Sequence, residues 1–324
     1  MFFFCYGTDK DLVWLRSQLK DKYEVDGDIL GCGKDECREG KFLGRLIRYT
    51  SAGIEWEADP KQVASLVAEF GLDNCKGADT PGVKSDVDGS DENMNSADAS
   101  RFRRGAAKLN YLSQDRVDIS FASKEISRHM SSPKIGDDVL LKRVVRYLQK
   151  HPRLVISYPW QEDATEIVAY TDSDWGGCVK TRRSTSGGTL MRGKHMIIHW
   201  SRTQQLIALS SAEAELNAAV KAAQEGLGVA HLEEEFGRWL RVRLLGDSSA
   251  NHGMIQRQGA GKVKHLTVRQ LWLQQQAELG CAIHEKIPRA IKCADMLTHY
   301  WTKTDAADHL RHLHCYRPEP RTTN

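Results

Sequence analysis

Four acidic residues lie where strands end or helices begin in the expected order of elements. They are Asp172, Glu215, Asp247 and Asp295. Such ends can converge on one edge of a sheet, where carboxylates repel one another and raise one another's pKa. Divalent cations relieve that repulsion, and Mg²⁺ prefers hard oxygen ligands. Two such ions about 4 Å apart can activate a water and stabilise the leaving oxygen of a phosphodiester. The placement therefore predicts phosphodiester hydrolysis.

Each carboxylate also has a structural explanation when it is taken singly. Asp172 or Asp247 could cap the segment that follows its strand. Asp295 could be a helix N-terminal charge that the helix dipole favours. Glu215 could be a solvated residue beside Glu213. The metal-site hypothesis thus depends on the joint placement of the four residues.

The elements expected from Glu166 onward would carry these residues on a mixed sheet. Three short strands, at 167–172, 187–191 and 196–201, predict an antiparallel meander. A long helix follows, capped by Ser210 or Ser211 and running to about Phe236. Strands at 240–245 and 282–287, short helices between them and a helix from about 291 complete the order β-β-β-α-β-α-β-α. This order predicts an α/β fold with helices packed on a five-stranded sheet.

Length and composition indicate a globular intracellular protein. The 324 residues suggest about two domains. The hydrophobic share of 40% and charged share of 27% exclude a fully disordered chain, a collagen-like fibre and a coiled-coil rod. No apolar stretch approaches the roughly 20 residues that span a bilayer, so no membrane partner is expected. Residues 1–6 are apolar but lack a signal peptide's basic flank, so they predict a buried strand. The eight cysteines form no C-x-x-C pair and are expected to be reduced.

The net charge of +3 conceals two opposed blocks. Residues 78–100 contain six acidic residues and one lysine, and they predict an acidic disordered linker. Residues 101–153 contain 13 Lys and Arg against 5 Asp and Glu. This basic excess favours a phosphate-rich partner, although one solvated helical face explains it equally well.

Three sequence motifs resemble the Pol polyproteins of copia-type LTR retrotransposons. Residues 170–177 (YTDSDWGG) look like the opening of that family's ribonuclease H domain, and 182–188 (RRSTSGG) and 208–216 (ALSSAEAEL) match the segments that follow. Weaker matches lie at 247–250, 264–269 and 294–298. The resemblance implies a ribonuclease H-like mixed five-stranded sheet with flanking helices. It also implies hydrolysis of the RNA strand of RNA–DNA hybrids with two Mg²⁺ or Mn²⁺ ions.

The resemblance places Asp172, Glu215, Asp247 and Asp295 on the family's four metal-binding, catalytic carboxylates. Contacts with the nucleic-acid backbone are expected from a basic turn and from two residues four apart on a probable helix. These candidates are Arg182, Arg183, Ser184 and Thr185 in the turn, and His265 and Arg269 on the helix, where a structural role is equally open. Trp175 and Trp200 are expected in the core rather than as base-stacking platforms. Many cellular ribonucleases H carry a histidine in the loop before the last carboxylate; residues 287–292 have none, and Lys292 is a cation that could replace it.

The first half resembles the end of the same family's reverse transcriptase. A helix at 12–20, a strand at 42–47, a helix at 60–70 and mainly helical structure over 101–150 are expected there. The resemblance divides the chain into a partial palm at 1–77, the acidic linker at 78–100, a basic helical thumb or connection region at 101–160, the ribonuclease H domain at 161–305 and a C-terminal tail at 306–324.

Polymerase activity is not expected of this chain alone, because the polymerase's catalytic Asp pair would lie just before Met1. Other parts of the polyprotein are expected partners, together with the RNA–DNA hybrid. Two alternatives to a ribonuclease H stay open. The chain could be a non-catalytic nucleic-acid-binding remnant of a decayed element, or an interaction protein adopted by the host.

Overall fold

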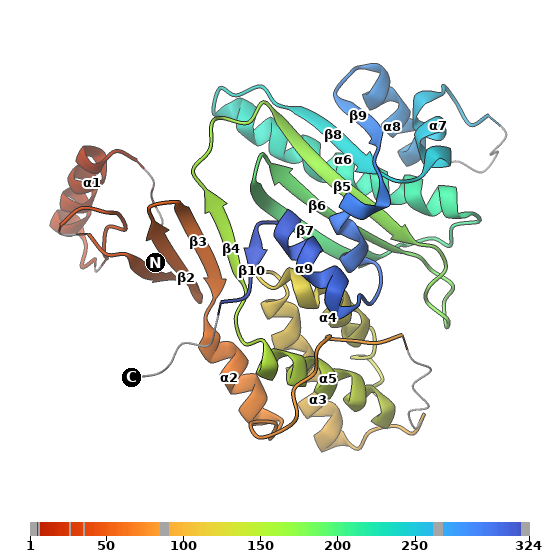
Figure 1. Ribbon diagram of the computed structural model, residues 1–324, viewed down its shortest axis with the longest axis horizontal. Coiled ribbons are helices and arrows are strands. Elements are labelled where there is room, and N and C mark those ends of the chain that lie inside the picture. Colours follow the sequence, from red (N-terminus) through yellow and green to blue (C-terminus); the bar gives the residue numbers. More distant parts are fainter. Residues whose placement is uncertain are drawn as a thin grey trace.

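The computed structural model of the protein describes residues 5, 7–25, 27–34, 36–84, 91–261 and 268–318. These residues form two five-stranded sheets with helices packed against them (Figure 1). The predicted α/β class is therefore confirmed. The strand predicted at 1–6 lies outside the described residues except for Cys5, and so does His265. All eight cysteines are free.

The first sheet is antiparallel throughout and has the strand order β1-β2-β3-β4-β10. Its strands are β1 Glu39–Phe42, β2 Arg45–Thr50, β3 Gly53–Ala58, β4 Val155–Pro159 and β10 Cys315–Tyr316. They come from three of the segments that the sequence was expected to keep apart, at 1–77, 101–160 and 306–324. The first sheet therefore ties the two halves of the chain together.

A tight turn divides the segment that was predicted as one strand at 42–47. Leu43 and Gly44 have φ angles of 47° and 73°. Positive φ at both central residues is the signature of a type I′ hairpin turn. The Arg45 guanidinium donates to the Leu43 carbonyl at 2.9 Å and so holds the turn. Phe42 consequently pairs with Arg45 across a hairpin instead of continuing the same strand.

Helices from the first half pack together below the first sheet in Figure 1. They are α2 Pro60–Glu69, α3 Ser96–Leu112, the short η1 Val117–Ile119, α4 Ser120–Ser127 and α5 Ile135–Lys150. Phe102, Leu109, Val144 and Leu148 are buried in their shared core. The predicted mainly helical structure over 101–150 is thus confirmed. The helix α1 Asp9–Lys22 stands apart and buries no residue.

The prediction of disorder over 78–100 is wrong for much of that segment. Residues 96–100 form the start of α3, where the Asn95 side chain accepts from the Asp98 N–H at 2.9 Å. Asn93 forms an isolated β-bridge with Lys134. The Ala78 N–H donates to a carbonyl of α5 at 3.1 Å. Caps and backbone pairing therefore order the segment where large apolar residues are few; residues 85–90 lie outside the described ranges.

The second sheet has the order β7-β6-β5-β8-β9. Its strands are β5 Glu166–Asp174, β6 Thr185–Arg192, β7 His195–Thr203, β8 Arg241–Gly246 and β9 Ala282–Lys286. The predicted meander β5-β6-β7 is antiparallel, whereas β8 and β9 run parallel to β5. The five strands and the predicted order of elements up to β9 are therefore confirmed.

A long helix, α6 Ser211–Glu235, covers one face of this sheet. Its buried face is rich in alanine, and Gly226 lies so close to the sheet that a Cβ there would come within 2.7 Å of Val242. Small residues therefore let the helix approach β5 and β8 closely. The shorter α7 Ser249–Gln256 and α8 Val268–Glu278 pack beside it. Neither α6 nor any other helix in the described ranges is long and apolar enough to cross a membrane.

The C-terminal part differs from the prediction in two ways. The helix expected from about 291 is replaced by two 3-10 turns, η2 Arg289–Ile291 and η3 Cys293–Leu297, and α9 begins only at Lys303. The expected tail at 306–324 is wrong for its described first part, because α9 Lys303–His312 and β10 are ordered there. Leu310 and Leu313 are buried in the core, and β10 pairs with β4. Burial of these apolar side chains explains the order.

Candidate active site

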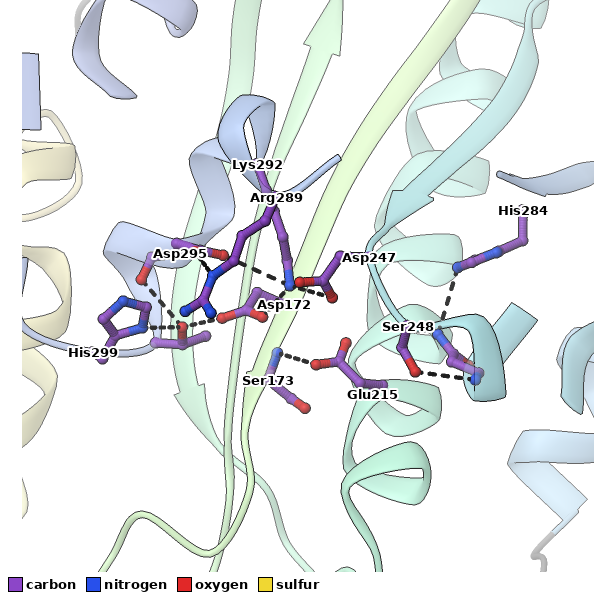
Figure 2. Close-up of polar contacts among 12 residues, drawn as sticks. Asp172, Ser173, Glu215, Asp247, Ser248, His284, Arg289, Lys292, Asp295 and His299 are labelled. Carbon is purple, nitrogen blue, oxygen red and sulfur yellow. Dashed lines mark hydrogen bonds and ion pairs between the residues drawn. The ribbon is translucent and has the colours of Figure 1, made fainter. Parts of the chain in front are cut away.

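Two neighbouring parallel strands bring Asp172 and Asp247 to the same edge of the second sheet. The strands β5 and β8 are in register, with Tyr170 opposite Leu245, and Asp247 directly follows β8. The helix α6 packs on β5 and presents Glu215 from its second turn. Carboxylate oxygens of Asp172, Glu215 and Asp247 lie within 4.8 Å of one another (Figure 2). Three of the four predicted carboxylates therefore form one cluster.

The start of α6 explains why Glu215 rather than Glu213 faces the site. Ser210, and not Ser211, is the N-cap, and its hydroxyl accepts from the Glu213 N–H at 3.2 Å. The Glu213 carboxylate in turn accepts from the Leu209 N–H at 2.8 Å. Glu213 therefore takes part in capping the N-terminus of α6, whereas the Glu215 side chain, two residues later, faces the edge of the sheet.

The carboxylate of Glu215 is buried, and only one of its two oxygens has a hydrogen-bond partner among the described residues. Its Oε1 accepts from the Ser173 N–H at 3.2 Å, whereas Oε2 has no hydrogen-bond partner among the described residues. Burial, helped by the nearby Asp172 and Asp247, raises the pKa of Glu215 to about 7. An unpartnered carboxylate oxygen in a buried site is suited to a cation.

Asp295 joins the cluster from η3, whose five residues are all buried. One oxygen of its carboxylate lies 3.6 Å from the Lys292 ammonium, and the other accepts from the Arg289 guanidinium at 3.4 Å. Burial raises the pKa of Asp295, and the neighbouring Asp172 adds to the effect. The fourth predicted carboxylate is therefore linked to Asp172 and Asp247 through Lys292.

Lys292 occupies the centre of the four carboxylates, as Figure 2 shows. Its ammonium donates to Asp172 and also to Asp247, at 2.8 Å for the latter. Burial by itself would lower the pKa of Lys292, but Asp172 and Glu215 outweigh burial and raise it. The sequence pointed to Lys292 only as a possible substitute for a loop histidine, and its burial within the site was not foreseen.

Thr298 is a second residue that the sequence did not identify. Its buried hydroxyl donates to the Asp172 carboxylate and lies 3.1 Å from the Asp295 carbonyl oxygen. Gly187 on β6 makes room for this contact, since a Cβ there would come within 2.7 Å of the Thr298 methyl group. Thr298 therefore orients Asp172 and holds η3 against the sheet.

The donor set fits a divalent cation. Carboxylate oxygens are the hard ligands that Mg²⁺ and Mn²⁺ favour. Asp172, Glu215 and Asp247 each offer an oxygen to one small volume, and Glu215 Oε2 is buried without a partner among the described residues. This triad can hold a metal ion provided that the Lys292 ammonium gives way.

Known proteins resemble the chain over most of its length. It is 32% identical to the uncharacterized mitochondrial protein AtMg00810 of Arabidopsis thaliana over 184 residues, 57% of this chain and 75% of that protein. It is 25% identical to the retrovirus-related Pol polyprotein from transposon RE1 of Arabidopsis thaliana, over 81% of this chain and 18% of the polyprotein. The corresponding polyprotein from transposon TNT 1-94 of Nicotiana tabacum is 22% identical over 90% of this chain and 22% of its own length.

The chain belongs to the retrovirus-related Pol polyproteins of copia-type retrotransposons. It spans less than a quarter of either transposon polyprotein. No protein-family model matches it. Among solved structures, ribonuclease H1 from the archaeon Halobacterium salinarum aligns with 41% of this chain and 94% of its own, at 18% identity and a TM-score of 0.29. That likeness is too weak to support an argument about the site.

The basic turn of this Pol-family chain divides into exposed and buried halves. Arg182 and Arg183 are exposed. Ser184 and Thr185 are buried: the Ser184 hydroxyl accepts from the Gly176 N–H at 3.0 Å, and the Thr185 hydroxyl accepts from the Lys124 ammonium at 2.8 Å. The two arginines are thus presented outward by two side chains that anchor the turn.

The remaining predicted contacts have different outcomes. Arg269 lies on α8, where its guanidinium donates to Gln205 at 3.4 Å. Trp200 is 5% exposed and belongs to the core, as predicted. The same prediction is wrong for Trp175, which is 55% exposed because its indole N–H is held at the surface by the Ala208 carbonyl at 2.9 Å.

Part of the basic excess over 101–153 is neutralised by ion pairs, and many of its basic residues are paired. Arg104 and Lys108 both contact Glu69 on α2. Arg116 pairs with Asp118 inside the core. Further pairs join Arg153 to Glu57, Lys150 to Asp79 and Lys142 to Asp138. Three acidic residues outside the segment, Glu57, Glu69 and Asp79, therefore offset part of its positive charge.

Proposed function

We propose that residues 161–305 form a ribonuclease H domain that hydrolyses the RNA strand of RNA–DNA hybrids with two divalent ions. The single observation that carries the proposal is the meeting of Asp172, Glu215 and Asp247 within 4.8 Å at one edge of the sheet. Membership of the Pol family and the five-stranded mixed sheet support it.

The proposed roles follow from the contacts of each side chain. Asp172, Glu215, Asp247 and Asp295 would hold the ions, which when bound activate a water and stabilise the leaving 3′ oxygen. The Ser173 N–H orients Glu215 at 3.2 Å. Asp172 is fixed by the Thr298 hydroxyl. These hydrogen bonds keep carboxylates that repel one another in a set geometry.

The substrate would lie over the exposed residues around this edge. Arg182 and Arg183 offer guanidinium groups for phosphates, and Arg269 and His265 remain proposed contacts. Trp175 offers an exposed indole for sugar or base contact. Selection of RNA requires a group that senses the 2′-hydroxyl, because that hydroxyl distinguishes RNA from DNA. Other parts of the polyprotein are proposed partners.

The test is cleavage of a labelled RNA–DNA duplex by the full chain, with Mg²⁺ or Mn²⁺ and with EDTA. We expect metal-dependent cutting of the RNA strand and none of an all-DNA duplex. Asp247→Asn should abolish cutting, because it removes a ligand from the cluster, while circular dichroism stays unchanged. Asp308→Asn, an exposed carboxylate on α9, is the matched control. Full activity of Asp247→Asn would refute the proposal.

A further inference from the structure

Lys292 is a fixed part of the site rather than a mobile surface lysine. Its N–H donates to the Arg289 carbonyl at 3.1 Å, and its own carbonyl accepts from the Asp295 N–H at 3.2 Å. The backbone is therefore held by the 3-10 turns on both sides. The side chain is only 2% exposed and points into the carboxylates, as Figure 2 shows.

The ammonium contacts two of the three carboxylates that could hold a metal ion. It pairs with Oδ1 of Asp172 and, at 2.8 Å, with Oδ1 of Asp247, two members of the metal-binding triad. It also lies 3.6 Å from Asp295. A lysine ammonium and a divalent ion cannot share these carboxylates at close range, because charges of the same sign repel strongly in a largely buried site.

We propose that Lys292 is a resident counter-ion of the site, and that a divalent ion binds between Asp172 and Asp247 only by displacing its ammonium. Metal binding is then a cation exchange. The lysine neutralises part of the carboxylate repulsion in the metal-free protein and lowers the affinity of the site for metal. The inference rests on the proposed function in taking a divalent ion as the ligand.

Substrate should favour the exchange. The displaced ammonium needs a new anionic partner, and a bound hybrid would bring phosphates to the carboxylates that Lys292 contacts. A charge-assisted hydrogen bond to phosphate would replace the lost ion pairs. Metal and hybrid therefore bind cooperatively in the wild-type chain, and this cooperativity depends on Lys292.

The experiment is Mn²⁺ binding to the full chain without substrate, measured by isothermal titration calorimetry. The variants are Lys292→Gln, Lys292→Met, the charge-preserving Lys292→Arg and the control Lys221→Gln, which removes one ammonium from an ion pair on α6. We expect Lys292→Gln and Lys292→Met to bind Mn²⁺ at least about tenfold more tightly than wild type. Lys292→Arg should keep an affinity near that of wild type, and so should Lys221→Gln.

A second measurement covers the case of an unstable variant. Without Lys292 the carboxylates lose their counter-ion, so Lys292→Gln should melt at a lower temperature than wild type in EDTA and recover in Mn²⁺. If it unfolds completely in EDTA, the Mn²⁺ concentration that refolds it gives the affinity instead. Equal or weaker Mn²⁺ binding by both neutral variants would overturn the inference.

Hybrid cleavage measured in parallel separates this inference from the proposed function. Cleavage by wild type together with equal Mn²⁺ affinities would leave the ribonuclease assignment standing and remove the role of Lys292. If wild type neither binds Mn²⁺ nor cleaves, but Lys292→Gln binds Mn²⁺, the counter-ion role holds and the catalytic proposal fails for this chain. Absence of Mn²⁺ binding in every variant would overturn both.

Discussion

Glu215 should make the metal-free protein less stable as the pH rises. Its carboxylate is buried, and burial together with Asp172 raises its pKa from 4.5 to about 7. A carboxyl with a raised pKa in the folded state holds its proton more tightly there than in the unfolded chain. The unfolding free energy therefore falls as the pH rises from about 4.5 to about 7. Above pH 7 it stays lower by the full amount that the ionised Glu215 costs.

The size of the effect follows from the pKa difference. A change from 4.5 to about 7 corresponds to roughly 3 kcal/mol, at about 1.36 kcal/mol for each pH unit. Glu215→Gln keeps the shape of the side chain and removes the charge. In EDTA at pH 8 the variant should unfold with a free energy about 3 kcal/mol higher than wild type. At pH 4, where Glu215 is protonated in both states, the two proteins should be equally stable.

The assay is urea unfolding followed by circular dichroism across this pH range. Glu225→Gln, on the outer part of α6 in an ion pair with Lys221, is the control and should show no such trend. With Mn²⁺ at pH 8, wild type should become more stable than Glu215→Gln, since only the ionised glutamate is a good ligand. A stability difference that is constant with pH, or a less stable Glu215→Gln at pH 8, would refute the reasoning.

Three further predictions concern residues outside the carboxylate cluster. Asp118→Asn should cost about 3–5 kcal/mol in urea unfolding, because it leaves the Arg116 guanidinium buried without its charge partner; loss of less than about 1 kcal/mol would contradict this. Trp200→Ala should cost about 3–5 kcal/mol, whereas Trp175→Ala should change stability little and weaken hybrid binding in fluorescence anisotropy. Arg183→Ala should make hybrid binding less dependent on salt: the slope of log binding constant against log salt concentration should fall by about the amount for one phosphate contact. An unchanged slope would argue against that contact.

The parts of the site that the sequence predicted are those with local signals. Asp247 directly follows β8 and Asp172 lies two residues before the end of β5, and a pattern of short apolar runs marks those strands. Glu215 follows a serine cap at a fixed spacing, and that cap turned out to be Ser210. Each of these signals lies within a few residues of the side chain it positions, so the element and its acidic residue could be found together.

The parts that the sequence did not predict depend on contacts between distant segments. The exposure of Trp175 follows from a hydrogen bond to Ala208, 33 residues away. The place of Lys292 follows from ion pairs with Asp172 and Asp247, 120 and 45 residues away. Neither spacing has a local signature, and a lysine near an acidic residue is far more often a solvated surface residue. Only the assembled sheet shows that this lysine is enclosed.

The packing of η3 shows why the predicted division of the chain at residue 305 does not separate the site from its support. Cys293, Met296 and Leu297 of η3 are buried in the same cluster as Leu310 and Leu313, which follow that boundary. The cluster also includes buried residues of α5 and β4, in the first half of the chain. Pairing of β10 with β4 completes the connection. The turn that carries Asp295, directly after Lys292, is therefore held by both halves of the molecule, so the helical region contributes to the geometry of the carboxylates even where it provides no ligand.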